Sequence, residues 1–268
     1  MHRFRSSIDW REVFARNATA PRPIPWNAPV RWTPDERSAI AASIQEFQLG
    51  EQSEGHTLRR CAKRYAARTG DTAYPDAMRL FIDEEARHAA ELARLLTSAG
   101  ERLKTHTPLD SVFRRLRKLG LGDGLEVCLR VLVTAEVVAL LYYAALRDAT
   151  RCPVTQALCA QILRDEAAHV RFHAERLAQI QASRSRLHRH AVRSAHRGLM
   201  LGTASAVWLG VHRHVLRRGG LTARAFVSGC VRTLNRRVLR VDETYARQLD
   251  PEARSSATSE LQAAPIPR

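Results

Sequence analysis

The residues whose types and spacing best suit catalysis or metal binding lie in two short motifs. Each motif reads acid-Glu-x-x-His, once within DEEARH and once within RDEAAH. Their members are Glu84, Glu85 and His88 in the first motif and Asp165, Glu166 and His169 in the second. Residues three positions apart share one helix face, so each motif can offer a carboxylate and an imidazole to the same or adjacent metal ions. One Glu-x-x-His is weak evidence, but two such motifs that each follow an acidic residue rarely arise by chance.

A further acid falls inside a predicted apolar helix. Glu136 is the only acid in the 20 residues from Val127 to Leu146, a run without Lys. The single Arg of that run, Arg130, is six positions away and faces another side of the helix. A lone buried carboxylate costs on the order of several kcal/mol unless a positive charge accompanies it. A bound cation is therefore the first candidate for that charge.

The first predicted helix carries two acids at positions where its apolar stripe is interrupted. The stripe consists of Ile40, Ile44, Phe47, Leu58, Cys61 and Tyr65, and the missing positions are Glu51 and Glu54. Glu54 precedes Glu85 by 31 residues, close to the 30 that separate Glu136 from Glu166, whereas Glu51 precedes Glu85 by 34. This symmetry favours Glu54 as a metal ligand, but it leaves Glu51 open.

These motifs and single acids resemble the ferritin-like di-metal carboxylate superfamily. The resemblance covers about residues 35–182 and implies an all-α fold with a ferritin-like four-helix bundle. The ligands it implies are Glu54 or Glu51, Glu85, His88, Glu136, Glu166 and His169. In the oxygen-activating branches, the acid before the motif Glu hydrogen-bonds the His of the opposite helix, and Glu84 and Asp165 occupy these positions. Carboxylates with two imidazoles and no thiolate suit two Fe ions or a Mn/Fe pair.

Three more side chains are expected near the ligands. His173 follows His169 by four residues, and we expect it to pack beside the ligands or to orient one of them rather than to be a third imidazole ligand. Tyr143 follows Glu136 by seven residues, and Tyr65 lies on the apolar stripe of the first helix. Either could be a redox-active phenol, although core tyrosines are common.

Helix-start and helix-stop residues place the elements that must position these side chains. Thr33, Pro34 and Glu36 predict a capped start of a helix that runs to about Arg68. Gly50 and Gly55 flank its two acids, which suggests a close neighbour, a substrate or a distortion, because glycine costs about 1 kcal/mol within a helix. Further helices are expected at about 74–98, 123–149 and 154–182, with a loop and a short basic helix at 101–121.

The chain divides into four predicted parts. They are a Pro/Trp-rich extended arm at 1–33, laid over the domain by Trp10, Trp26 and Trp32; the bundle at 34–183; a basic helical extension at 184–249, with helices at about 190–217 and 222–247; and a disordered polar tail at 250–268.

The basic extension accounts for most of the net charge of +16. Between residues 184 and 247, 14 Arg stand against two acids. Small residues recur every four positions at Gly198, Gly202, Ala206 and Gly210, a spacing that allows close helix packing. We therefore weigh a fifth helix packed on the bundle or on a second copy in a homodimer against a helix lying on an anionic membrane surface. Nucleic acid is disfavoured, because no recognition motif or interleaved aromatics occur.

The cysteines and the N-terminal sequence bear on the compartment. The five cysteines are odd in number and form no Cys-x-x-Cys, which favours reduced thiols and a cytoplasmic protein, peripheral to a membrane if the extension binds lipid. The first residues are basic without an apolar run, unlike a secretory signal.

Three functions fit these observations. The leading hypothesis is an enzyme, an oxidoreductase that uses O2 at a di-iron or Mn/Fe centre to oxidise a small molecule that the sequence does not identify. The second is a ferroxidase or iron-handling protein. The third is a non-catalytic scaffold with a basic surface, in which both motifs are solvated helix faces and Arg87 and Arg164 pair with their acids.

Overall fold

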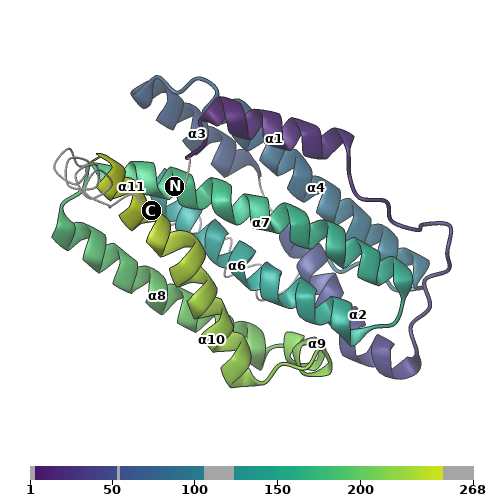
Figure 1. Ribbon diagram of the computed structural model, residues 1–268. Helices are drawn as coiled ribbons and strands as arrows, with labels where there is room; N and C mark the ends of the chain where they lie inside the picture. The colour runs from purple at the N-terminus through teal and green to yellow at the C-terminus, as the bar shows by residue number, and fades with distance from the viewer. Residues whose placement is uncertain (1–3, 53–54, 106–123, 250–268) are drawn as a thin grey trace, which may run out of the picture.

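The computed structural model describes residues 4–52, 55–105 and 124–249, and the all-α prediction is confirmed for these residues, among which no strand occurs. Their elements are α1 (Ser7–Thr19), α2 (Pro34–Glu51), α3 (Gly55–Thr69), α4 (Tyr74–Ser98), α6 (Leu125–Ala149), α7 (Pro153–Ala182), α8 (Arg186–Leu209), α9 (His212–Arg218), α10 (Ala223–Leu234), the π-helix η1 (Asn235–Leu239) and α11 (Arg240–Leu249). Figure 1 shows α6 and α7 in the middle, with α1 and α4 on one side and α8 and α10 on the other.

The N-terminal arm begins with a helix that was not predicted. Ser6 and Asp9 form a capping box at the start of α1, which packs against α4. Trp10 is buried, and its Nε1 donates a hydrogen bond of 2.8 Å to Glu175 on α7. The prediction of a wholly extended arm was wrong, because the prolines that suggested it begin only at Pro21.

The remainder of the arm runs without helix to α2 and lies on the domain. Trp26 and Trp32 are half-buried and pack against the core. The Nε1 of Trp32 donates to Thr155 Oγ1 on α7 at 3.0 Å, and the guanidinium of Arg94 lies over the ring of Trp26. Tryptophans thus attach both halves of the arm to helices that carry ligand candidates.

The first predicted helix is two helices. Its start is as predicted, with a capping box between Thr33 and Glu36. However, α2 ends at Glu51 and α3 begins at Gly55, so the prediction of one helix to about Arg68 was wrong. A Cβ at Gly55 would lie 2.4 Å from Ile82 Cγ2 on α4, so glycine permits the close approach of α3 to α4. Residues 53–54, between the two helices, lie outside the described residues.

The next three helices have the predicted order and nearly the predicted bounds. α4 ends where Gly100 takes a positive φ of 77°, the left-handed conformation that glycine adopts without strain. By length and composition α6 could cross a membrane. However, 67% of its most apolar window is buried inside the protein, as is typical of a core helix. The short basic helix predicted within 101–121 falls largely outside the described residues.

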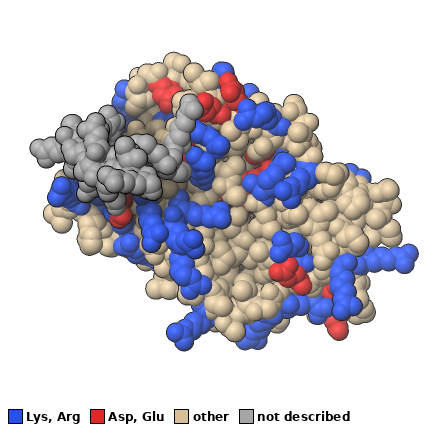
Figure 2. All heavy atoms as spheres, in the orientation of Figure 1, with Lys and Arg blue, Asp and Glu red and all other residues tan. Residues whose placement is uncertain are grey.

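The basic extension contains more elements than predicted. Instead of two long helices, α8, α9, α10, η1 and α11 follow one another, and α9 contacts both α2 and α6. Met200, Ala204 and Val207 form the buried face of α8, whereas a Cβ added at Gly198 or Gly202 would meet no atom of the described residues outside its own helix within 4 Å. These two glycines therefore do not serve close packing against the described part of the chain. Lys and Arg outnumber Asp and Glu on the face shown in Figure 2. The predicted tail lies outside the described residues.

The contact of α9 with α6 depends on one glycine and gives a first prediction. A Cβ at Gly219 would lie 2.3 Å from the carbonyl oxygen of Ala145 and 2.7 Å from its Cα. Backbone atoms cannot rotate away, so Gly219→Ala should lower the free energy of unfolding by about 1–3 kcal/mol, as overpacking does. Urea denaturation followed by circular dichroism measures this. Gly198→Ala is the matched control, because it faces open space on α8 and should be neutral or stabilising by up to about 1 kcal/mol.

Candidate metal centre

Six side chains form two adjoining groups that could hold metal ions. One group consists of Glu51, Glu85, His88 and Glu166, and the other of Glu85, Glu136, Glu166 and His169. Within each group the potential ligand atoms lie within 4.8 Å of one another. Glu85 and Glu166 belong to both groups, so the two groups adjoin and form one cluster that could hold metal.

The helices explain why these residues meet. Each motif places its Glu and His on one face of α4 or α7, and these faces look toward each other. His169 Nδ1 on α7 lies 2.9 Å from Glu85 Oε1 on α4. His88 Nδ1 on α4 lies 3.7 Å from Glu166 Oε1 on α7. α6 adds Glu136, whose Oε2 lies 3.6 Å from His169 Nδ1.

The acids that precede the two motif glutamates contact the imidazoles on the side that faces away from the centre. His88 Nε2 lies 3.1 Å from Asp165 Oδ2, and His169 Nε2 lies 2.9 Å from Glu84 Oε2. Each acid thus contacts the imidazole of the opposite helix. An ionised carboxylate only accepts hydrogen bonds, so each Nε2 is the donor and each Nδ1 is left to face the centre.

Arg87 takes part in this outer layer rather than pairing with the ligand carboxylates. Its guanidinium contacts both Asp165 and Glu84. Burial acts to raise the pKa of Asp165, but the contacts with His88 and Arg87 outweigh it and lower the pKa to about 2. Asp165 is therefore ionised at neutral pH. Arg164 also contacts Asp165, on its other oxygen.

The inner carboxylates are crowded around His169. Burial acts to lower the pKa of His169, but its hydrogen bonds with Glu136, Glu166 and the other nearby carboxylates raise it well above the usual value. Burial raises the pKa of Glu51, Glu85 and Glu166, and repulsion from neighbouring carboxylates raises each further. Within the described residues, their ion-pair contacts are to histidines alone, and Arg130 pairs instead with Glu126. This cluster has the charge and the crowding that divalent cations would relieve.

Unsatisfied polar atoms support the same conclusion. Several buried atoms of the two groups form no well-shaped hydrogen bond with the described residues, although Glu85 Oε1 and His169 Nδ1 lie 2.9 Å apart. They are Glu85 Oε1, His88 Nδ1, Glu136 Oε1, Glu166 Oε2 and His169 Nδ1. Buried polar atoms are normally satisfied. Other buried atoms elsewhere in the described residues share this property, but these five converge within the two groups, so this donor set could hold a metal ion.

His173 lies against the second group. It is fully buried, and neither ring nitrogen has a hydrogen-bond partner. Its Nε2 is 4.0 Å from Glu136 Oε1, and its ring packs on Phe81 and Phe172. Burial lowers the pKa of His173 to about 3, so the imidazole is neutral. It can therefore meet Glu136 as a hydrogen-bond donor without adding positive charge.

Of the two ligand candidates predicted in the first helix, the structure describes Glu51. It lies at the last residue of α2, and Tyr143 on α6 donates a hydrogen bond of 2.8 Å to its Oε1. Glu54, which the spacing favoured, lies outside the described residues. Tyr143 therefore touches a ligand candidate directly, whereas the Tyr65 hydroxyl accepts a hydrogen bond from Arg176.

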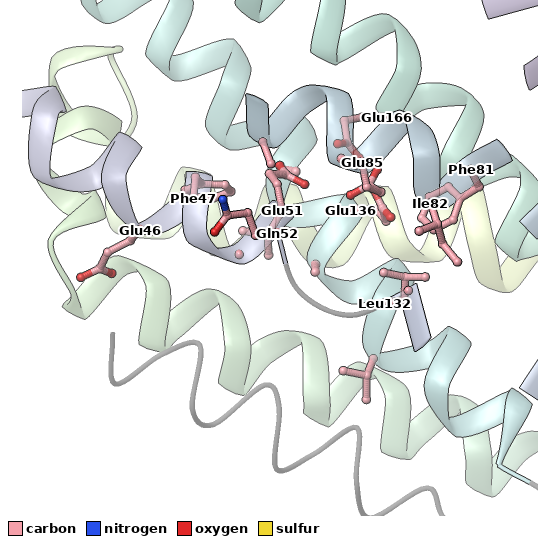
Figure 3. A pocket seen from close by; sticks show the side chains of 18 of the residues that line it. Glu46, Phe47, Glu51, Gln52, Phe81, Ile82, Glu85, Leu132, Glu136 and Glu166 are labelled. Carbon is pink, nitrogen blue, oxygen red and sulfur yellow. The ribbon is translucent and has the colours of Figure 1, made fainter. Parts of the chain in front are cut away.

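A cavity of about 430 Å³ adjoins the centre. Glu51, Glu85, Glu136 and Glu166 line it together with apolar side chains of α4, α6 and α8 (Figure 3). Glu46 on α2 and His212 on α9 also line it, and neither was predicted from the sequence to lie near the centre. Glu46 lies outside the apolar stripe of its helix, and His212 arrives from more than 40 residues beyond the last ligand, so only the tertiary fold brings them here.

Comparison of the chain with models of protein families, with curated proteins and with solved structures gave no match. The assignment of the centre therefore rests on the geometry of its residues.

The outer hydrogen bonds give a second prediction. Asp165→Asn preserves the shape of the side chain but removes the charge that orients His88, so Mn(II) or Fe(II) affinity should fall about 10–100-fold. Competition with a fluorescent chelator under anaerobic conditions measures the affinity. Asp83→Asn is the control, because Asp83 belongs to the same acidic run as Glu84 but is exposed and pairs with Arg59 and Arg79. Equal affinities of the two variants would contradict an orienting role.

Proposed function

We propose that α2 with α3, α4, α6 and α7 form a ferritin-like four-helix bundle, and that its acidic core holds two iron ions or a manganese and an iron ion. We further propose that this centre uses O2 to oxidise an organic molecule. The observation that carries the proposal is the reciprocal pairing in which Asp165 contacts His88 and Glu84 contacts His169.

This pairing supports a working metal centre over a solvated helix face. Asp165 and Glu166 are buried, and so are both imidazoles, whereas solvated faces would leave such groups exposed. The two acids orient the two imidazoles so that their Nδ1 atoms face the centre. This orientation is useful if the Nδ1 atoms bind a metal ion. A scaffold protein would gain nothing from this expensive burial.

The residues of this chain have distinct parts in the proposed chemistry. When bound, iron supplies the one-electron steps that O2 reduction needs. Glu85 and Glu166, which belong to both groups, would contribute to holding both ions, and His88 and His169 would each contribute to one. Tyr143 holds Glu51 by its hydrogen bond, and the apolar side chains beside the centre limit the access of water.

The cavity favours an organic substrate over Fe(II) itself. An iron ion on its way to a ferroxidase centre needs a narrow polar path, whereas this cavity is mostly apolar and within the roughly 300–1,000 Å³ range of small-molecule pockets. The ferroxidase function remains the second candidate, because it would use the same ligands.

The other expectations remain predictions. A cytoplasmic location, a homodimer and a contact with anionic membranes agree with the basic extension but rest on sequence alone. On α8, Leu187, Leu201 and Leu209 are exposed, so either a second copy or a lipid surface could cover this face.

A third prediction tests the centre and its reaction with O2. After anaerobic reconstitution with Fe(II), the full-length protein should retain about two iron ions per chain. Glu51→Ala should reduce this to about one, because it removes a ligand from only one of the two groups. Metal analysis after desalting gives the stoichiometry, and stopped-flow mixing with O2 should produce a near-ultraviolet ferric absorption band.

Controls separate the candidate functions. Glu12→Ala, an exposed acid on α1, should leave the iron content unchanged. If O2 oxidises only the bound iron, the result agrees with an enzyme whose organic substrate is missing from the assay. If excess Fe(II) in solution is also oxidised over many turnovers, the result favours the ferroxidase. Less than about a tenth of an equivalent of iron or manganese after reconstitution would contradict both.

A further inference from the structure

Helix α8 presents a long uncharged face to solvent. Figure 1 shows α8 at one edge of the molecule, and its inner side contacts α10 and α6. On the outer side, Leu187, Leu201 and Leu209 are 80%, 51% and 75% exposed. These leucines belong to a row in steps of three and four residues, which share one helix face, and we call this row the leucine stripe. Its members are Leu187, Ala191, Ser194, Gly198, Leu201, Ser205 and Leu209.

Exposed apolar side chains are concentrated on this stripe. Val211, directly after α8, adds another that is 36% exposed. Elsewhere in the described part of the chain, the large apolar side chains that are exposed are Ile8, Leu103 and Val127, which lie on three separate segments. Single exposed apolar residues are ordinary, but a row of them on one helix marks a surface that binds something apolar.

A row of arginines borders the leucine stripe. Arg186, Arg193 and Arg197 each lie one position before a residue of the stripe. Arg193 pairs with Glu243 at 2.9 Å, whereas Arg186 and Arg197 are exposed and form no ion pair with the described residues. Arg197 donates only to the neutral side chain of Asn235. No Asp or Glu occurs from residue 176 to residue 241, so α8, α9 and α10 offer these arginines no counter-charge.

The leucines and the arginines together indicate the partner. A second copy of the chain could cover the leucines, but its own α8 would bring more arginines and no acid. A nucleic acid would neutralise the arginines but would leave the leucines in water. An anionic phospholipid surface offers phosphate groups next to an apolar layer, so it satisfies both rows at once.

We propose that α8 lies flat on an anionic phospholipid surface, with Leu187, Leu201 and Leu209 inserted among the lipids and Arg186 and Arg197 paired with lipid phosphates. The buried side of α8 stays packed on the protein, so the contact is peripheral and the helix does not cross the bilayer. The proposal is independent of the chemistry of the metal centre.

Co-sedimentation of the full-length protein with vesicles tests the proposal. One set of vesicles is phosphatidylcholine alone, and the other is phosphatidylcholine mixed with phosphatidylglycerol. At about 0.15 M salt the protein should bind the mixed vesicles at least about tenfold more tightly, because the arginines attract the anionic lipid. Part of this binding should persist at high salt, because salt does not screen the burial of the leucines.

Leucine variants separate the stripe from the net charge of +16, which by itself attracts anionic lipid. Leu187→Gln combined with Leu209→Gln keeps the charge and should weaken binding at least about tenfold, because two apolar side chains lose their contact with lipid. Both positions are largely exposed, so the fold should persist, which circular dichroism checks. Ile8→Gln is the control, because it replaces an exposed apolar residue on α1 and should bind as the unchanged protein does.

Arginine variants test the position of the charge. Arg186→Gln combined with Arg197→Gln should weaken binding to the mixed vesicles at least about fivefold more than Arg11→Gln combined with Arg64→Gln. The second pair removes the same charge from exposed positions on α1 and α3. Equal losses in the two pairs would show that only the net charge matters, and would overturn the proposed contact.

Three further results would overturn the proposal. They are no binding to the mixed vesicles even at low salt, equal binding to both kinds of vesicle, and a leucine variant that binds as tightly as Ile8→Gln. Sedimentation velocity without lipid examines the competing occupant. A dimer that the leucine variant converts into a monomer, without a change in vesicle binding, would assign the leucine stripe to a second copy instead.

Discussion

Four carboxylates and two imidazoles share one cluster in the interior of this protein, and the free energy of holding them there constrains everything around it. Glu136 and Glu166 are almost fully buried, and Arg130, the only base on the same stretch of α6, points to Glu126 instead. Unpaired buried charge is among the most destabilising features a fold can contain. Protons shared among the carboxylates reduce this cost, and metal ions would remove it while satisfying the unpaired ligand atoms.

The surrounding helices keep the cluster in place through contacts between distant parts of the chain. The motif acids tie α4 to α7 across the centre. The N-terminal helix adds a clamp from outside, because Trp10 is fixed by Glu175 on α7 while α1 packs on α4. At the other end, α9 brings His212 to the cavity, and its approach to α6 depends on Gly219. The arm and the extension therefore belong to the architecture of the site.

The sequence predicted what depends on local spacing. Glu-x-x-His is a three-residue step on one helix face, so its two copies could be recognised without a structure, as could the cap at Thr33 and the bounds of α4. The helix around Trp10 was missed because nearby prolines dominated the interpretation of the arm. The preference for Glu54 came from the spacing of the two halves and stays a prediction, because Glu54 lies outside the described residues, whereas Glu51 ends α2. Glu46 and His212 could not be paired from sequence, because 165 intervening residues and the path of α9 decide their meeting.

The most direct test of the account is the position of the metal ions in crystals of the protein loaded with Mn(II) or Fe(II). Anomalous difference maps recorded at the absorption edge of the metal should show two peaks per chain, one among Glu51, Glu85, His88 and Glu166 and the other among Glu85, Glu136, Glu166 and His169. A separation of about 3.5–4 Å is expected for such paired ions. A map with no peak in this cluster, or with peaks only at surface acids, would contradict the account.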